Sequence, residues 1–506
     1  MACPPHPRPV RKVIGVLAGS LLVIAAASIV GTHLRDGTHE RATSDRPEPA
    51  VLLESPGGGG EAEDAEAHTA DGEAREAAEL TRSRVAASDA AGDAGLSGRT
   101  GPRRPIPNPG WTTERVWNVR ADDWEPAIAA DPSAPFVYTL VTRYTGPRRC
   151  STCPIPSIVL RVSNDGGRTW GPDRFLCICR ATHHAQYDPQ IVVDADGTVF
   201  AAWLEGFQPG VSVSRSNDNG RTWSKPVSMP QAWSDKPWLA VSPSGQDVYV
   251  AYNGPSHGDS FVGVSHDGGA TFAAKKVTDR DRYFFAGGGW VSADGRHVAF
   301  AESDFDQRYA AQIHSDVVVS ADGGATWQVV RVATGDRQPD CTSDGCYDGF
   351  YGPTPTLAGD ASGDLMLVYA ANDADRAPQR VFATTSVDGG LTWADPAPLS
   401  PPRADALFPA AASGGAGDFR VWWMDDRTGR WNVWYSATTD AGETWSDATR
   451  LSNGRGGTAY KGPKGFLEAY GDYGEIDVTS GGATVAIWGE GTSYAGPGGV
   501  WFVRQR

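Results

Sequence analysis

The chain has 506 residues, of which 40% are hydrophobic and 21% are charged, and it contains 61 glycines, 36 prolines and 18 tryptophans. Its formal net charge of -16 at pH 7 argues against a nucleic acid as partner, because a phosphate backbone is bound by an excess of lysine and arginine. The glycine and proline content favours an all-β protein with many turns.

The N-terminal segment, residues 1–34, is predicted to anchor the protein in a membrane. Arg8, Arg11 and Lys12 precede an uncharged apolar run at 13–30, which as a helix would extend about 27 Å, close to the thickness of a bilayer core. Basic residues on the N-terminal side place the rest of the chain outside the cytoplasm. We expect an uncleaved anchor; cleavage at 25–27 is the alternative and would release a secreted protein.

The next segment, residues 35–110, differs in composition from the rest of the chain. It contains 15 acidic residues against 9 arginines, a run of four glycines at 57–60 and almost no aromatic side chains. Such a sequence buries too little apolar surface to offset the entropy of ordering. We predict a disordered acidic linker that separates the membrane from a folded domain at 111–506.

One repeated segment organises residues 111–506. The pattern Ser-x-Asp-x-Gly-x-Thr-Trp begins at residue 163, and variants begin at 216, 265, 320, 386 and 438, at intervals of 53, 49, 55, 66 and 52 residues. Each copy is typical of a β-hairpin turn, in which the aspartate accepts backbone hydrogen bonds, glycine adopts a positive φ and tryptophan packs beside the turn. We therefore expect structural aspartates, and the period predicts a β-propeller.

These segments resemble the Asp-box, or BNR, repeats of the sialidase-like superfamily. The resemblance covers nearly all of residues 111–506 and implies a propeller fold. It is a weak guide to activity, because the same fold carries hydrolases, lyases and binding proteins.

Seven short apolar runs are predicted to be the innermost strands of the blades. They are 126–130, 190–193, 238–241, 289–292, 354–358, 409–412 and 475–478. The seventh set ends with the chain at 501–503 and lacks a fourth strand, while 115–119 precedes the first set without a partner. We predict that these two segments pair and close a seven-bladed propeller. Six blades, as in most sialidases, is the alternative.

Six cysteines follow the apolar run, and an even number in an exported domain favours disulfides. They are Cys150, Cys153, Cys177, Cys179, Cys341 and Cys346. The last two bracket a short loop and are expected to pair. The first two precede the first box and the next two follow it, so we predict cross-links between these pairs. A four-thiolate zinc site, with His183 and His184 nearby, is the alternative.

The resemblance places the boxes on one face of the propeller and the functional loops on the other. Carboxylates, arginines and aromatic rings gather in those loops, which suits a carbohydrate, and paired carboxylates can hydrolyse a glycosidic bond. The candidate catalytic residues are Tyr473, Glu302, Glu205, Asp188 and Glu125. The candidate substrate-binding residues are Arg143, Arg308, Arg427, Asp235 and Trp238.

The sialidase mechanism implied by the resemblance needs three arginines, a tyrosine paired with a glutamate, and an aspartic acid. Tyr473 matches the position of that tyrosine, and Glu302 or Glu205 is its expected partner. The family's Phe-Arg-Ile-Pro signature is absent, since 124–126 reads Trp-Glu-Pro, and the loop at 145–156 contains no aspartate. Another glycan chemistry is therefore open.

The sequence thus predicts a membrane-anchored, extracytoplasmic glycoside hydrolase of exo-sialidase type that acts on an extracellular glycan or glycoprotein. The alternative is a propeller without catalytic activity that binds a glycan or a protein. We expect a monomer without a cofactor. Calcium held by Asp304 with Asp306, or by Asp373 with Asp375, is the alternative.

Overall fold

The computed structural model describes residues 110–177, 183–206, 210–230, 235–254, 259–278, 283–305, 312–336, 355–429, 431–452, 461–462, 465–466, 474–491 and 498–506. Within these ranges the regular structure consists of β-strands. No helix within these ranges has the length and apolarity needed to cross a membrane. The predicted anchor at 1–34 and almost all of the predicted linker at 35–110 lie outside the described residues.

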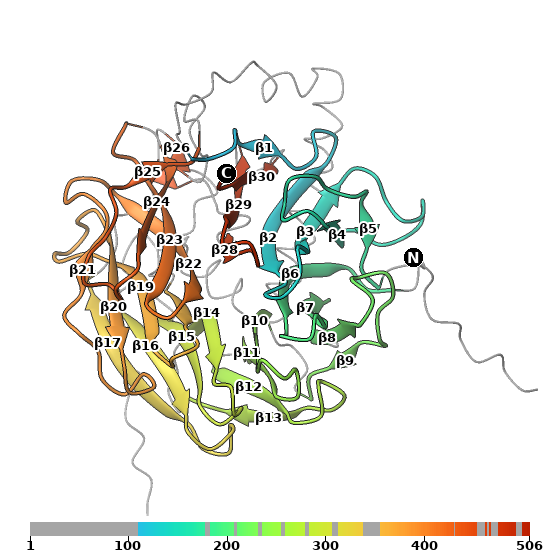
Figure 1. Cartoon of the computed structure of the whole chain (residues 1–506), viewed down its shortest axis with the longest axis horizontal. Coiled ribbons are helices and arrows are strands. Elements are labelled where there is room, and N and C mark those ends of the chain that lie inside the picture. The colour runs from blue at the N-terminus through green and yellow to red at the C-terminus, as the bar shows by residue number, and fades with distance from the viewer. Residues whose placement is uncertain are drawn as a thin grey trace, which may run out of the picture. The chain divides into compact units, whose positions relative to one another are not determined.

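Antiparallel units of four strands repeat along the described chain (Figure 1). The first three units are β2 (Asp122–Ala130), β3 (Val137–Thr145), β4 (Ser157–Ser163) and β5 (Arg174–Phe175); β6 (Gln186–Val193), β7 (Val199–Glu205), β8 (Gly210–Ser216) and β9 (Val227–Ser228); and β10 (Asp235–Val241), β11 (Val248–Asn253), β12 (Ser260–Ser265) and β13 (Ala273–Lys276). The next three are β14 (Tyr283–Val291), β15 (Val298–Phe305), β16 (Ile313–Ser320) and β17 (Gln328–Gly335); β18 (Thr356–Gly359), β19 (Leu365–Ala371), β20 (Arg380–Ser386) and β21 (Ala397–Pro398); and β22 (Ala406–Gly415), β23 (Asp418–Asp425), β24 (Asn432–Thr438) and β25 (Thr449–Arg450).

The last unit joins the two ends of the folded region. It contains β28 (Glu475–Val478), β29 (Thr484–Gly491), β30 (Gly498–Arg504) and, from the other end of the sequence, β1 (Arg115–Val116). Arg115 pairs with Phe502 and Val116 with Trp501, which confirms the predicted pairing of 115–119 with the C-terminal strand. A short hairpin of β26 (Lys461–Gly462) and β27 (Gly465–Phe466) precedes this unit.

The first strand of each unit packs against the first strand of the next. The order of contact is β2, β6, β10, β14, β18, β22, β28 and again β2, and these strands surround a common centre in Figure 1. The core fills the spaces between neighbouring sheets; Leu140 and Leu160, for example, pack with Trp203 of the following unit. The arrangement is therefore propeller-like, as the repeats predict.

Two neighbouring units merge into a single eight-stranded sheet through a parallel contact of β14 with β18, at Gly288 and Leu357. Glycine is required here by space, since a Cβ atom on Gly287 would lie 2.0 Å from the carbonyl oxygen of Pro355. On Gly288 it would lie 2.2 Å from the nitrogen of Leu357. Gly287 and Gly288 thus let two inner strands approach closely.

The boxes form the hairpin turns that the sequence predicts, between the third and fourth strands of their units. In the third box, the backbone N–H groups of Ala270 and Thr271 donate to Asp267 Oδ1 at 3.0 and 2.9 Å, and the Thr271 hydroxyl donates to Oδ2 at 2.6 Å. The Thr271 bonds lead the causes that lower the pKa of Asp267 to about 2. These interactions assign the aspartate to the turn itself.

The cysteine prediction needs a correction. Cys150 and Cys153 form a disulfide with each other, so the predicted cross-link from this pair to Cys177 and Cys179 is wrong. The two cysteines lie on a tight turn in which Cys153 N donates to Cys150 O at 3.1 Å, with a Cα separation of 5.1 Å. The disulfide also removes two thiolates from the alternative zinc site. Cys179, Cys341 and Cys346 lie outside the described residues.

Candidate functional site

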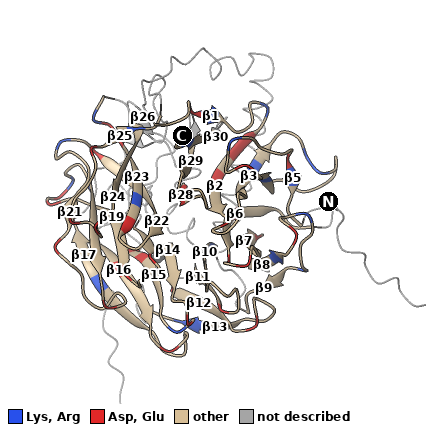
Figure 2. Cartoon of the chain, viewed as in Figure 1, with Lys and Arg blue, Asp and Glu red and all other residues tan. Residues whose placement is uncertain are grey.

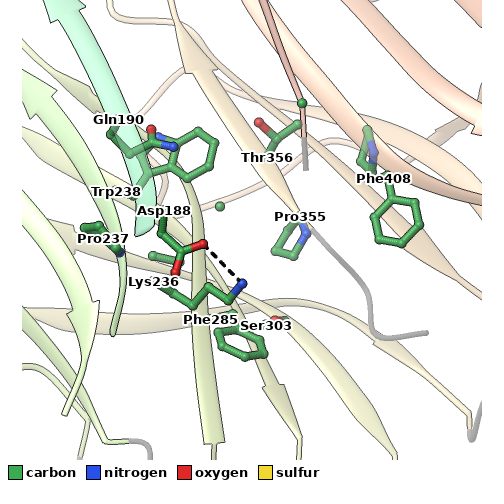
Figure 3. Close-up of a pocket in the computed structure, with 14 residues that line it drawn as sticks. Asp188, Gln190, Lys236, Pro237, Trp238, Phe285, Ser303, Pro355, Thr356 and Phe408 are labelled. Atoms are coloured by element: carbon green, nitrogen blue, oxygen red, sulfur yellow. Dashed lines mark ion pairs between the residues drawn. The ribbon is translucent and has the colours of Figure 1, made fainter. Parts of the chain in front are cut away.

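A pocket that opens to solvent, with a cavity of about 70 Å³ for water-sized molecules, lies where the inner strands converge (Figure 3). Its wall comes from β6, β10, β14, β15, β18, β22 and the residues just before β18 and β28. The lining residues are Asp188, Gln190, Lys236, Pro237, Trp238, Phe285, Ala286, Gly287, Ser303, Pro355, Thr356, Phe408, Pro409 and Gly474. The boxes lie beside the far ends of the inner strands, as Gly268 N shows by donating to Gln246 O in the β10–β11 turn at 2.9 Å.

Strained backbone occurs at several positions on the inner strands around this centre. Glu125, Asp188, Lys236 and Phe408 have φ angles of 53°, 47°, 46° and 52°, and each is followed by proline. The strand register shifts at each of these positions, so each forms a β-bulge. A positive φ costs a non-glycine residue of order 1 kcal/mol or more, and such strain collects at functional sites.

The charged wall of the pocket is formed by β6 and β10. Asp188 Oδ1 lies 3.6 Å from Lys236 Nζ, an ion pair drawn in Figure 3. Behind Asp188 lies Glu125, which is 5% exposed and accepts hydrogen bonds from Tyr144 Oη at 2.7 Å and from Asp188 N at 3.0 Å. Burial, and then the nearby Asp188 carboxylate, raise the pKa of Glu125 to about 7, while Lys236 opposes this rise.

The remaining wall is largely apolar. Trp238 from β10, Phe285 from β14 and Phe408 from β22 line it together with prolines. Lys236 Nζ also lies 5.7 Å from the centroid of the Phe285 ring, within the range of a cation–π contact. A pocket with one charged wall and one aromatic wall suits a ligand that has both hydroxyl groups and apolar faces.

Two predicted arginines are not brought to the pocket. Arg143 is fully buried in an ion-pair network, with Nε 2.8 Å from Asp123 Oδ1 and Nη1 2.7 Å from Asp173 Oδ2. Arg427 donates from Nε to Asp425 at 2.9 Å and lies 3.9 Å from the Trp434 ring centroid. Both guanidinium groups are held by structural partners within their own units.

Two predicted glutamates also lie away from the pocket wall. Glu302 is 0% exposed and accepts a hydrogen bond from the Ser260 hydroxyl of the preceding unit. Burial raises its pKa to about 8, and neighbouring Asp316 and Asp304 add to this rise. Glu205, at the end of β7, is partly buried, and burial raises its pKa as well.

The other predicted positions divide into three groups. Asp188 and Trp238 line the pocket, and Glu125 touches Asp188. Asp235 opens β10, where its backbone pairs with Asn253. Tyr473 and Arg308 lie outside the described residues.

Lys236, Phe285 and Phe408 were not among the predicted site residues, although they line the pocket. A signal for two of them was present in the sequence. Lys236 and Phe408 each precede a proline at the start of an innermost strand, as Glu125 and Asp188 do. A repeated bulge at this dipeptide would have pointed to the same set of positions.

The described residues contain no group of three histidine, cysteine or carboxylate side chains arranged to hold a metal ion. Asp304, a predicted calcium ligand, pairs with His314 and lies 3.2 Å from Arg331 Nη2. Its predicted companion Asp306 lies outside the described residues.

The fold and the site together define a propeller-like, all-β protein with a central pocket of charged and aromatic residues. No family model matches the chain. A sialidase from Micromonospora viridifaciens is 26% identical over 300 residues, a match that covers 53% of this chain and 44% of the relative. This match confirms the similarity to the sialidase-like superfamily, and the chain spans less than half of the relative's length.

Solved structures of glycan-active proteins are similar at low identity. The Hadza microbial sialidase Hz136 is 18% identical with a TM-score of 0.42, over 76% of this chain and 66% of that one. A polysaccharide lyase of the PL25 ulvan lyase family is 11% identical with a TM-score of 0.46, over 78% of this chain and 95% of that one.

Proposed function

We propose that this protein is an extracytoplasmic glycoside hydrolase of sialidase-like fold that acts on a glycan in the central pocket. The observation that carries the proposal is the convergence of Asp188, Lys236 and Trp238 at one pocket in the centre of the ring. Asp188 is the carboxylate placed to act on a glycosidic bond. The aromatic wall supplies faces on which sugar rings stack, and Lys236 supplies a positive charge.

The substrate of this proposal is not restricted to sialosides. Three arginines hold the substrate in the mechanism that the resemblance implies, but Arg143 and Arg427 are engaged elsewhere. Lys236 is the one cationic side chain among the described residues of the pocket wall. We therefore propose a glycan whose polar groups face β6 and β10 and whose apolar face lies against β14 and β22.

The proposal extends to the whole chain. We propose seven blades, closed by β1 and β30, because seven first strands follow one another around the ring. An anchor at 13–30 would hold a monomeric propeller at the outer surface of the membrane, where an extracellular glycan or glycoprotein is accessible. The similarity to a sialidase supports a glycan as ligand.

The test is hydrolysis of a panel of sialosides and neutral glycosides by the purified full-length chain. We expect turnover of at least one glycoside, and Asp188→Asn should lower kcat by about 100-fold or more. Asparagine tolerates the positive φ at this position, so the variant should fold. Asp196→Asn, an exposed position in the β6–β7 turn, is the matched control. Full activity in Asp188→Asn would exclude the assigned role.

A binding function is the second candidate, because Asp188 is the one carboxylate among the described residues of the pocket wall. Under this alternative the whole panel remains uncleaved, while the protein still binds an immobilised glycan. Trp238→Ala should then abolish binding, since it removes the largest aromatic surface of the wall. The hydrolysis panel, together with glycan-array binding of the wild type and Trp238→Ala, distinguishes the two candidate functions.

A further inference from the structure

Two buried glutamates lie behind the charged wall of the pocket without lining it. Glu125 from β2 is 5% exposed and Glu475 from β28 is 9% exposed. Glu475 Oε2 accepts a hydrogen bond from Ile128 N on β2 at 2.6 Å. Glu475 thereby links the last inner strand, β28, to the first, β2. Glu125 links β2 to the second inner strand, β6.

Each glutamate contacts one polar residue of the pocket wall. Glu125 Oε2 accepts the backbone N–H of Asp188 at 3.0 Å, and Gln190 is near enough to Glu475 to lower its pKa. Asp188 and Gln190 both belong to β6 and both line the pocket. Since Asp188 has a φ of 47°, the contact from Glu125 supports a strained conformation.

We propose that Glu125 is a positioning residue, which fixes Asp188 in the pocket wall and makes that wall respond to pH. The inference rests on the proposed function only in taking this pocket as the ligand site. Glu125 does not line the pocket, so it acts through Asp188.

The surroundings of each glutamate explain the response to pH. Burial and then Asp188 raise the pKa of Glu125 to about 7, while Lys236 and the hydrogen bond from Tyr144 oppose them. Burial raises the pKa of Glu475 to about 8, with Asp477 adding to the rise and the hydrogen bond from Ile128 N opposing it. Glu125 therefore gains its negative charge between about pH 6 and 8. That charge arises beside the Asp188–Lys236 ion pair and favours the protonated form of Lys236.

Lys236 can report this charge without any glycan ligand. A limiting dose of acetic anhydride acetylates the neutral form of a lysine, and mass spectrometry compares Lys236 with the exposed Lys225 of the same molecule. In Glu125→Gln the added negative charge is absent. We expect the Lys236 to Lys225 labelling ratio at pH 8 to rise by about threefold. Glu475→Gln should leave the ratio unchanged, because Lys236 is not among the groups that shift the pKa of Glu475.

Asp477→Asn is the matched control for Glu125→Gln. Asp477 of β28 is a partly buried carboxyl that also accepts a backbone N–H of β2, from Ala130 at 2.7 Å, but it does not line the pocket. We expect it to leave the labelling ratio unchanged. If Glu125→Gln matches Asp477→Asn, the positioning role is overturned, and this result is independent of whether any glycoside is cleaved.

A reciprocal variant covers the case in which Glu125→Gln fails to fold. Loss of the Asp188 charge in Asp188→Asn should lower the pKa of Glu125, because that charge is one cause of its rise. The loss of stability with rising pH that the raised pKa of Glu125 causes should then be smaller and end at lower pH, in thermal unfolding measured between pH 5 and 8. An unchanged pH profile overturns the coupling of Glu125 to the pocket.

Discussion

At the scale of single residues, acidic side chains of this protein have pKa values shifted in opposite directions, and their surroundings explain why. Asp267 lies at the surface and accepts hydrogen bonds from its own turn, so its ionised form is stabilised and its pKa falls to about 2. Glu475 is enclosed between inner strands, so burial disfavours its ionised form and raises its pKa to about 8. The residue type alone predicts neither behaviour.

Asp267→Ala should destabilise the protein without affecting the pocket. The change removes the acceptor of three hydrogen bonds in the turn, and loss of such a capping interaction costs about 1 to 2 kcal/mol. Urea unfolding of the variant should show this loss. Asp196→Ala, at an exposed turn position, should lie within about 0.5 kcal/mol of the wild type. Equal stability of all three proteins would contradict the structural role of the box.

Arg143→Ala tests whether this arginine is structural or binds substrate. Its removal leaves Asp123 buried without its ion-pair partner, so we expect a loss of about 3 to 5 kcal/mol in the free energy of unfolding. Arg148→Ala, at an exposed position nearby, should have little effect on unfolding. A stable Arg143→Ala protein that loses activity or glycan binding would restore the predicted role in substrate recognition.

At the scale of elements, the strand that closes the ring joins the two ends of the folded region. Trp117 N donates to Val500 O at 2.7 Å, next to the β1–β30 pairing. The Phe502 ring lies 5.1 Å from the Trp170 ring and 6.2 Å from the Trp117 ring. One aromatic cluster therefore joins the residue that follows β1, the first box and the last strand. Closure thus depends on packing as well as on the strand ladder.

Phe502→Ala should weaken this closure. Phe502 is 2% exposed, and truncation of a buried phenylalanine costs about 3 to 5 kcal/mol. We expect a lower thermal midpoint together with faster hydrogen exchange of the amides in β1 and β30. Val119→Ala is the control, because Val119 is 41% exposed. Exchange that stays slow in β1 would show that the two ends are held together by other contacts.

At the scale of the whole molecule, the sequence predicts what depends on local pattern. The boxes follow from residues within eight positions of one another, and the pairing of 115–119 with the C-terminal strand follows from a count of strands. The environment of Arg143 does not follow from local pattern, because the register of neighbouring strands brings Asp123 and Asp173 next to it. Lys236 and Phe408 were missed because a bulge, rather than simple alternation along the strand, directs them to the pocket.

The charge distribution of the whole molecule also sets how its stability depends on pH. Charged positions occur on the inner strands as well as on the outer turns (Figure 2). Burial raises the pKa values of Glu475, Glu125 and Asp477 to about 8, 7 and 6, whereas Asp267 and similar box aspartates have values near 2. Two groups of carboxyls therefore act on stability in separate pH ranges.

We expect stability to be highest near pH 4 to 5 and to fall on both sides. A raised carboxyl pKa means that the folded state binds more protons than the unfolded state, so this contribution is complete below about pH 4 and is lost as pH rises through about 6 to 8. The box aspartates have lowered pKa values, so their contribution is lost as pH falls from about 4 toward 2. Thermal midpoints measured from pH 3 to 9 would show this maximum.

The triple variant Glu125→Gln, Glu475→Gln and Asp477→Asn should have a flatter profile above pH 5. A wild-type midpoint that rises between pH 5 and 8 would contradict the raised pKa values assigned to these three carboxyls in the folded state.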